Sequence, residues 1–250
     1  MNNIFDLNYT GNPFHFYGIQ HFSAFAAIIV VLGLMILFKR IRYDRGNEVI
    51  RYTLALGIIL NELGWHLWAI LHGEWVIQTA LPLHLCSIMV YLTPILLIRK
   101  SYRIYELIYL LGIAGAMQSL FTPNLTTYGF PHFLYFQFFI SHGSIILAGL
   151  FMTIVEGYRP NRNSGLRVFL TGNVFMVIVF FINRVIGSNY MFVSHKPLTP
   201  SLLDYLGPWP FYIIGIELFA ILSITLLYLP FIKNRSNQSD SPCFGKEAVN

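Results

Sequence analysis

The 250-residue chain is 56% hydrophobic and only 11% charged, with a mean hydropathy of +0.60. Soluble domains carry about 25% charged residues, so this composition excludes a soluble protein and indicates an integral membrane protein. The formal net charge of +5 would suit a nucleic-acid-binding protein. The basic residues, however, stand in short clusters between apolar runs, as topology signals do, and this distribution excludes nucleic acid as a partner.

Seven apolar runs approach the length of about 20 residues that a helix needs to cross a membrane. They cover residues 21–38, 49–71, 77–98, 104–120, 132–155, 166–187 and 209–232. We therefore predict an all-α, polytopic membrane protein whose seven transmembrane helices form one bundle over residues 21–232. Residues 1–20 show no cleaved-signal pattern and form an extracytoplasmic segment. Residues 233–250 are rich in Ser, Asn and charge, which predicts a disordered cytoplasmic tail.

The orientation of the bundle follows from the basic residues of the loops. The loops after the first, third and fifth runs are basic, as is the tail, whereas the second and fourth loops contain no Lys or Arg and the sixth has only Lys196. Positive residues are retained on the cytoplasmic side of a membrane. The alternation therefore predicts that the N-terminus lies outside and the C-terminus in the cytoplasm, as in a multi-pass protein of the cell membrane.

Polar residues within the runs fall almost entirely in the half nearest the outer surface, at a rise of about 1.5 Å per residue. A charged side chain at the bilayer centre costs about 2.5–3.5 kcal/mol on insertion scales, so these groups should face the bundle interior. They predict one polar cavity that opens toward the outer leaflet. Its candidate residues are Glu62, His66, His84, Cys86, Gln137, Ser141, His142, Asn183, Arg184 and Glu217.

The third run places an imidazole, a thiol and a hydroxyl within four positions, at His84, Cys86 and Ser87. On a regular helix, His84 and Cys86 would lie on opposite sides, so we expect His84 at the cavity edge or against another span. If Cys86 is a nucleophile, its base should come from another span, from His142 or His66. Ser87, three residues from His84 and on its face, is the competing nucleophile. A small apolar packing role is the alternative interpretation of Cys86.

The two intramembrane glutamates have a functional and a structural interpretation. Glu62 lies four residues before His66 and shares its helix face, so the carboxylate can orient the imidazole or pair with it when it is charged. Glu62 and Glu217 could instead form a structural clamp with Arg184. There is no HExxH or CxxC motif, so we expect no metal and no cofactor; zinc bound by a histidine cluster with Glu62 is the alternative.

Three stretches resemble motifs of the YwaF-type bacterial integral membrane proteins, which are related to transmembrane protein 164. Leu81–Ser87 is similar to the signature of the third span. Pro13-Phe14 with His21, and Phe136–Phe139 followed by Ser141-His142, are similar to patterns at the first and fifth spans. The resemblance covers most of residues 10–232 and implies a location in the bacterial plasma membrane.

The resemblance also implies a function. The animal relatives are associated with acyl transfer onto lysophospholipids through a catalytic cysteine on the corresponding helix. By resemblance, that role falls on Cys86, with His142 as the best candidate for its base and membrane phospholipids or lysophospholipids as substrates. The chain would then be a cysteine-dependent lipid acyltransferase or lipid hydrolase. The alternative is a non-catalytic protein that binds or transports a lipid or small solute; the lack of internal repeats counts against a transporter.

Overall fold

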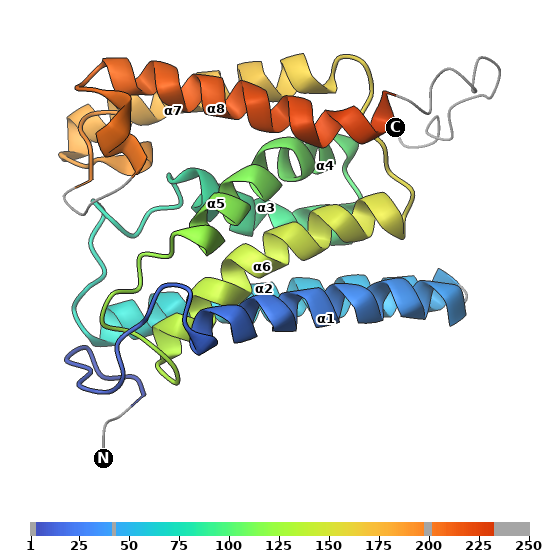
Figure 1. The fold of residues 1–250 in the computed structure, drawn as a ribbon, viewed down its shortest axis with the longest axis horizontal. Coiled ribbons are helices and arrows are strands. Elements are labelled where there is room, and N and C mark those ends of the chain that lie inside the picture. Colours follow the sequence, from blue (N-terminus) through green and yellow to red (C-terminus); the bar gives the residue numbers. More distant parts are fainter. Residues whose placement is uncertain (1–3, 42–43, 198–201, 233–250) are drawn as a thin grey trace.

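The computed structural model describes residues 4–41, 44–197 and 202–232, and these residues form helices and loops without β-strand (Figure 1). Six helical segments are long and apolar enough to cross a membrane, and a seventh, α3, is apolar but shorter. The long segments are α1 (Ile19–Ile41), α2 (Asp44–Leu71), α4 (Tyr102–Leu107) continued through the π-helical turn η1 (Ile108–Gly112) into α5 (Ile113–Phe121), α6 (Phe133–Ile154), α7 (Ser164–Ile186), and α8 (Phe211–Tyr228) with η4 (Leu229–Phe231).

The third predicted run is where sequence and structure differ most. A helix was expected over residues 77–98, but α3 spans Leu85–Arg99 only. Pro82 disfavours helical backbone at the residue before it, and His84 is an extended N-cap residue with ψ of 151°. The fifteen residues of α3 rise about 22 Å, which is less than the roughly 30 Å of a bilayer core. The segment before α3 therefore forms a non-helical stretch of chain beside the bundle.

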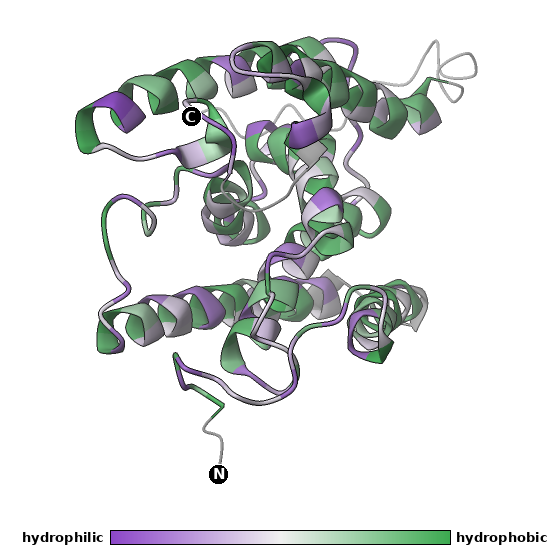
Figure 2. Ribbon diagram, turned by 60° about the vertical axis from the view of Figure 1, so that its left-hand side comes forward, coloured by the Kyte–Doolittle hydropathy of each residue, from purple (hydrophilic) through white to green (hydrophobic). Residues whose placement is uncertain are grey.

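The helices form three layers (Figure 1). Helices α7 and α8 lie together on one side of α3, α4 and α5, and α1 and α2 lie on the other side with α6 crossing against them. In the apolar window of α6, 67% of the residues are buried, against 11% in α7 and in α8. Helix α6 is thus the centre of the bundle. The outer helices expose Leu, Ile, Val and Phe over their surfaces, as membrane-facing helices do (Figure 2).

One end of the bundle gathers the basic residues. Arg51, about two turns into α2, donates to the Leu97 carbonyl oxygen of α3 at 2.7 Å. Lys100, just after α3, pairs with Glu156, just after α6, at 2.7 Å. Lys39 of α1 donates to the Ile154 carbonyl oxygen. The loops that follow the first, third and fifth predicted runs therefore meet at the same end of the molecule.

The opposite end is covered by residues 4–18. The Phe133 amide donates to the Ile4 carbonyl oxygen at 2.8 Å, and the Trp68 indole donates to the Phe5 carbonyl oxygen at 2.7 Å. These contacts join the N-terminal segment to the C-terminal end of α2 and the start of α6. The predicted cytoplasmic tail, residues 233–250, lies outside the described residues.

Candidate functional site

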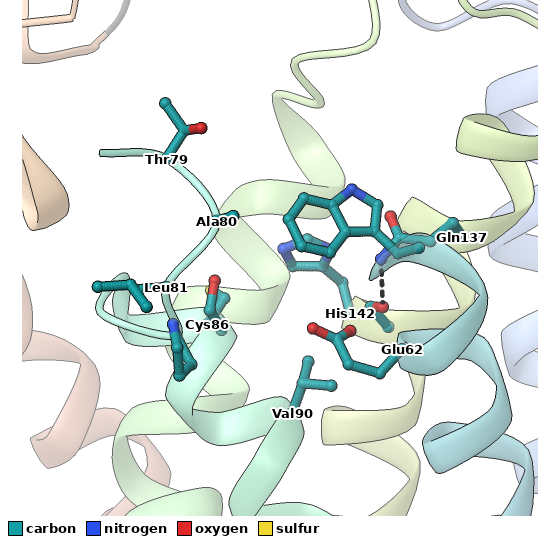
Figure 3. A pocket seen from close by; sticks show the side chains of 12 residues that line it. Glu62, Thr79, Ala80, Leu81, Cys86, Val90, Gln137 and His142 are labelled. Carbon is teal, nitrogen blue, oxygen red and sulfur yellow. Dashed lines mark hydrogen bonds between the residues drawn. The ribbon is translucent and has the colours of Figure 1, made fainter. Parts of the chain in front are cut away.

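A polar cavity of about 210 Å³ lies between α2, α3, α6 and the segment that precedes α3 (Figure 3). A buried water needs roughly 10–15 Å³ of such volume, so the cavity has room for on the order of ten waters or a small polar headgroup. Its lining consists of Glu62, Trp65, Thr79, Ala80, Leu81, Pro82, Cys86, Ser87, Val90, Gln137, Ser141 and His142.

Helical spacing explains which side chains reach the cavity. Gln137 and Ser141 stand four residues apart on one face of α6, and His142 follows on the adjacent side. The first turn of α3 also lines the cavity, and it begins directly after the proline-containing segment. The cavity therefore lies where α3 starts late, and the non-helical residues 79–82 form part of its lining.

Cys86 lies at the boundary between the cavity and α5. Its Sγ is 3.6 Å from the hydroxyl oxygen of Ser119, and a Cβ placed on Gly115 would lie 3.4 Å from the same sulfur. Within the described part of the chain, the hydrogen-bond partner of this sulfur is Ser119 and not an imidazole. Ser119 was absent from the predicted site because serine is common in apolar helices and nothing in the pattern marked it.

The hydrogen bonding of His142 defines its tautomer. Its Nδ1 lies 2.9 Å from the Phe138 carbonyl oxygen, which can only accept, so Nδ1 carries the proton. The other ring nitrogen, Nε2, then keeps its lone pair and is the atom able to take up a proton. The ring packs on Phe138 with a centroid distance of 4.2 Å, which fixes its direction.

Ser141 is held by donors from two helices. Asn61 of α2 donates to its hydroxyl oxygen at 2.8 Å, and Gln137 donates to it at 3.2 Å. The side chains of Gln137, His142 and Glu62 are drawn around the cavity in Figure 3. Asn61 was not among the predicted site residues, although an asparagine beside Glu62 in an apolar run was the signal that could have identified it.

Glu62 and His66 lie close together, as their spacing predicted. The Glu62 Oε1 is 3.9 Å from the His66 Nε2. His66, however, does not line the cavity. Its Nε2 lies 2.5 Å from the Tyr91 hydroxyl of α3, and its Nδ1 accepts from the Trp75 indole at 2.9 Å. Neither Tyr91 nor Trp75 was predicted, because aromatic residues are abundant throughout this sequence.

A model of the TMEM164 family matches residues 16–228, which run from the N-terminal segment to the end of α8. The chain belongs to the TMEM164 family. The comparison confirms the resemblance that the motifs indicated, and the matched region includes the whole cavity. No curated protein and no solved structure matches this TMEM164-family chain.

Two predicted cavity residues of this TMEM164-family protein join other parts of the chain. His84 accepts from the Met191 amide at 3.2 Å and packs on the rings of Tyr190 and Phe192. His84 thus lies against the turn after α7, and it stands outside the regular helix on which its expected position was based. Asn183 is buried and exchanges hydrogen bonds with the Tyr190 backbone at 2.9 Å, so it closes the turn after α7.

The prediction that Asn183, Arg184 and Glu217 line the cavity is wrong. Glu217 accepts from Asn173 at 3.0 Å between α8 and α7, and the Arg184 guanidinium lies 5.5 Å from the centre of the Phe180 ring. The predicted clamp between Glu217 and Arg184 is replaced by these contacts. Helices α7 and α8, which carry these residues, stand on the far side of α3–α5 from α2 and α6 (Figure 1).

In the described residues, no three side chains of His, Cys, Asp or Glu come together as metal ligands would. The zinc alternative around Glu62 thus has no ligand set there. The side chains close to Glu62 are the His66 imidazole and the Tyr91 phenol.

Proposed function

We propose that this TMEM164-family protein is a membrane-embedded enzyme that transfers or hydrolyses the acyl chains of phospholipids through Cys86. The observation that carries the proposal is that Cys86 of α3 and His142 of α6 line one polar cavity among apolar helices. A thiol becomes a nucleophile as its thiolate, and a neighbouring imidazole is the usual base. The unprotonated Nε2 of His142 has the required protonation state.

The proposed reaction has two steps. His142 Nε2 takes the thiol proton, the sulfur attacks the ester carbonyl carbon, and the C–O bond to the lysolipid breaks as the C–S bond forms. The departing oxygen receives the proton from His142. The acyl-thioester then passes its acyl group to a lysophospholipid hydroxyl or to water. The Gln137 amide is the donor in the cavity best suited to the oxyanion. Ser87 lines the same cavity and is the alternative nucleophile.

A second function has one observation in its favour. The sulfur of Cys86 is hydrogen-bonded to the hydroxyl of Ser119, as expected for a cysteine that packs between helices. In that case the cavity binds the headgroup of a lipid or a small solute without covalent chemistry. Binding that is unchanged by Cys86→Ser would favour this second function over the enzyme.

We also propose that all seven helical segments cross the membrane, with the N-terminus outside and the cavity near the outer surface. The gathering of Arg51, Lys100 and Lys39 at the end opposite the cavity supports this orientation. In a chain whose native cysteines are replaced by serine, a membrane-impermeant maleimide should label Lys196→Cys in intact cells. It should label Arg162→Cys only after permeabilisation, and the reverse result would overturn the orientation.

The chain offers its own control for the enzymatic proposal, since Cys86 and Cys243 are its two cysteines. We expect a thiol-directed lipid probe to label the wild type and Cys243→Ala equally and to lose its signal in Cys86→Ala. Equal labelling of Cys86→Ala would sink the proposal. In cells, deletion of the protein should change the acyl-chain distribution of the phospholipids.

A further inference from the structure

Three side chains form a line of hydrogen bonds that ends at the Glu62 carboxylate. They are Trp75, His66 and Tyr91, from three parts of the protein. The first is the indole of Trp75, in the segment between α2 and α3, which lies 2.9 Å from His66 Nδ1. An indole N–H can only donate. His66 Nδ1 is therefore an acceptor, and in the neutral ring the proton resides on Nε2.

The second donor is that Nε2–H. It lies 2.5 Å from the Tyr91 hydroxyl oxygen, which must accept this bond. The phenol proton is then free to be donated elsewhere, and the Glu62 carboxylate is the other hydrogen-bond partner of this hydroxyl. The direction of every hydrogen bond in this network is thus set by the Trp75 indole at its far end. The imidazole orients the carboxylate through Tyr91, which is the reverse of the relation that the spacing alone had indicated.

Glu62 is the member of this network that reaches the cavity. Its side chain is 16% exposed, and within the described ranges the basic side chain close to its carboxylate is the neutral imidazole of His66, at 3.9 Å, and not a Lys or Arg. A carboxylate in an apolar bundle is costly unless donors support it, and aligned donors reduce this cost. The other titratable groups at the cavity are Cys86 from α3 and His142 from α6. His142 is assigned to the proton of the Cys86 thiol. Glu62 is therefore a possible base for which the proton that it accepts has still to be identified.

We infer that Glu62 is the catalytic base that deprotonates the acyl acceptor, and that Tyr91, His66 and Trp75 are positioning residues that hold its carboxylate in the cavity. The inference rests on the proposed function. In the second step, the acceptor hydroxyl gives its proton to Glu62 as its oxygen attacks the thioester carbonyl carbon. The C–O bond forms, the C–S bond breaks, and the departing Cys86 thiolate regains a proton from the Glu62 carboxylic acid through the cavity. The carboxylate is thereby restored.

The test separates the two steps in the full chain. The protein is incubated with vesicles of phosphatidylglycerol that carry radiolabelled oleoyl chains, and the acyl-enzyme is counted before lysophosphatidylethanolamine is added as the acceptor. We expect Glu62→Gln to form the acyl-enzyme at the wild-type rate and to transfer its label about 10²–10⁴-fold more slowly, the usual contribution of a general base. Hydroxylamine, which cleaves a thioester without a base, should discharge the wild type and Glu62→Gln equally fast.

Each result has a separate meaning. Transfer by Glu62→Gln at the wild-type rate would overturn the inference and leave the proposed function standing. Equal losses in acylation and transfer would make Glu62 structural and would also overturn it. A wild type that forms no acyl-enzyme would end both proposals.

Tyr91→Phe is the second variant, because it removes one hydroxyl and keeps the packing. We expect its transfer step to slow by about tenfold, the effect of losing a hydrogen bond to a charged group. The acid limb of its pH–rate profile should move to higher pH, since a carboxylate without this donor keeps its proton longer. An unchanged profile and rate in Tyr91→Phe would contradict the positioning role.

Discussion

The hydroxyl of Tyr190 forms hydrogen bonds with two backbone groups, of Leu81 and Ile77, in the segment that forms the rim of the cavity. It accepts from the Leu81 amide at 2.8 Å and donates to the Ile77 carbonyl oxygen at 2.7 Å. Tyr190 is fully buried, and its own backbone is fixed by Asn183. The connection after α7 thereby positions the non-helical segment before α3, which supplies Leu81 and its neighbours to the cavity.

Tyr190→Phe should loosen this rim. The substitution keeps the ring but leaves the backbone groups of the exposed Ile77 and the half-buried Leu81 without this partner, at a cost of about 0.5–1.5 kcal/mol for each hydrogen bond. We expect faster amide hydrogen exchange over residues 72–84 and little change in α6. The exposed Tyr205, which is 88% accessible, provides the matched control as Tyr205→Phe. Equal exchange in both variants would show that the hydroxyl does not hold the segment.

The helical fold could be predicted because each helix needs only a long apolar run, and the sequence shows such runs directly. The late start of α3 was the exception. The run 77–98 is apolar throughout, so hydropathy could not reveal a non-helical stretch, although Pro82 marked its position. The end of α2 at Leu71, in contrast, matches the prediction because Gly73, at a positive φ of 71°, follows it.

The site could be predicted only in part. Residue depth follows from counting along a span, and this brought Glu62, Cys86 and His142 to one level. The lateral order of the helices does not follow from depth, so Glu217 was placed in a cavity from which α3–α5 separate it. Tyr91 escaped prediction for a different reason, since its contact with His66 joins two helices whose relative rotation the sequence does not specify.

Arg51 should contribute strongly to stability. It is 2% exposed, donates to the Leu97 carbonyl oxygen and pairs with Glu156 at 3.4 Å between its Nε and the carboxylate. Lys100 also pairs with Glu156, so the loss in Arg51→Met is that of the bonds of the guanidinium itself, at about 1.5–3 kcal/mol for a hydrogen bond from a charged group. We expect Arg51→Met to lower the thermal midpoint in detergent far more than Arg99→Met, which changes an exposed arginine. Similar midpoints for the two variants would contradict this structural role.

Two glycines in helices should respond to alanine with opposite signs. A Cβ at Gly149 of α6 would lie 2.9 Å from Ile113 Cδ1 and 3.2 Å from its Cγ1. Overpacking of this kind costs about 1–3 kcal/mol, so Gly149→Ala should be destabilised. Gly57 of α2 is exposed and has open space around its Cα. Gly57→Ala should gain about 0.5–1 kcal/mol from its better helix propensity. Thermal unfolding of both variants in the same detergent decides the point, and a destabilised Gly57→Ala would count against it.

His132 should make stability depend on pH. It lies directly before α6, accepts from the Leu134 amide through Nδ1 at 3.1 Å, and bonds the Asp6 carbonyl oxygen through Nε2 at 3.0 Å. Burial lowers the pKa of His132, although the Asp6 carbonyl opposes this effect, and the neighbouring His72 lowers it further. Protonation at Nδ1 would also replace the acceptor that the Leu134 amide needs.

The sign of the effect follows from the lowered pKa. The unfolded chain takes up this proton near the ordinary value of about 6.5, before the folded protein does. The stabilisation is therefore complete above pH 6.5 and is lost as the pH falls through the lower pKa of the folded state. Thermal midpoints measured across this range should fall less steeply in His132→Gln than in the wild type. His15→Gln, at an exposed histidine, should retain the wild-type slope, and a His132→Gln slope equal to that of the wild type would refute the assignment.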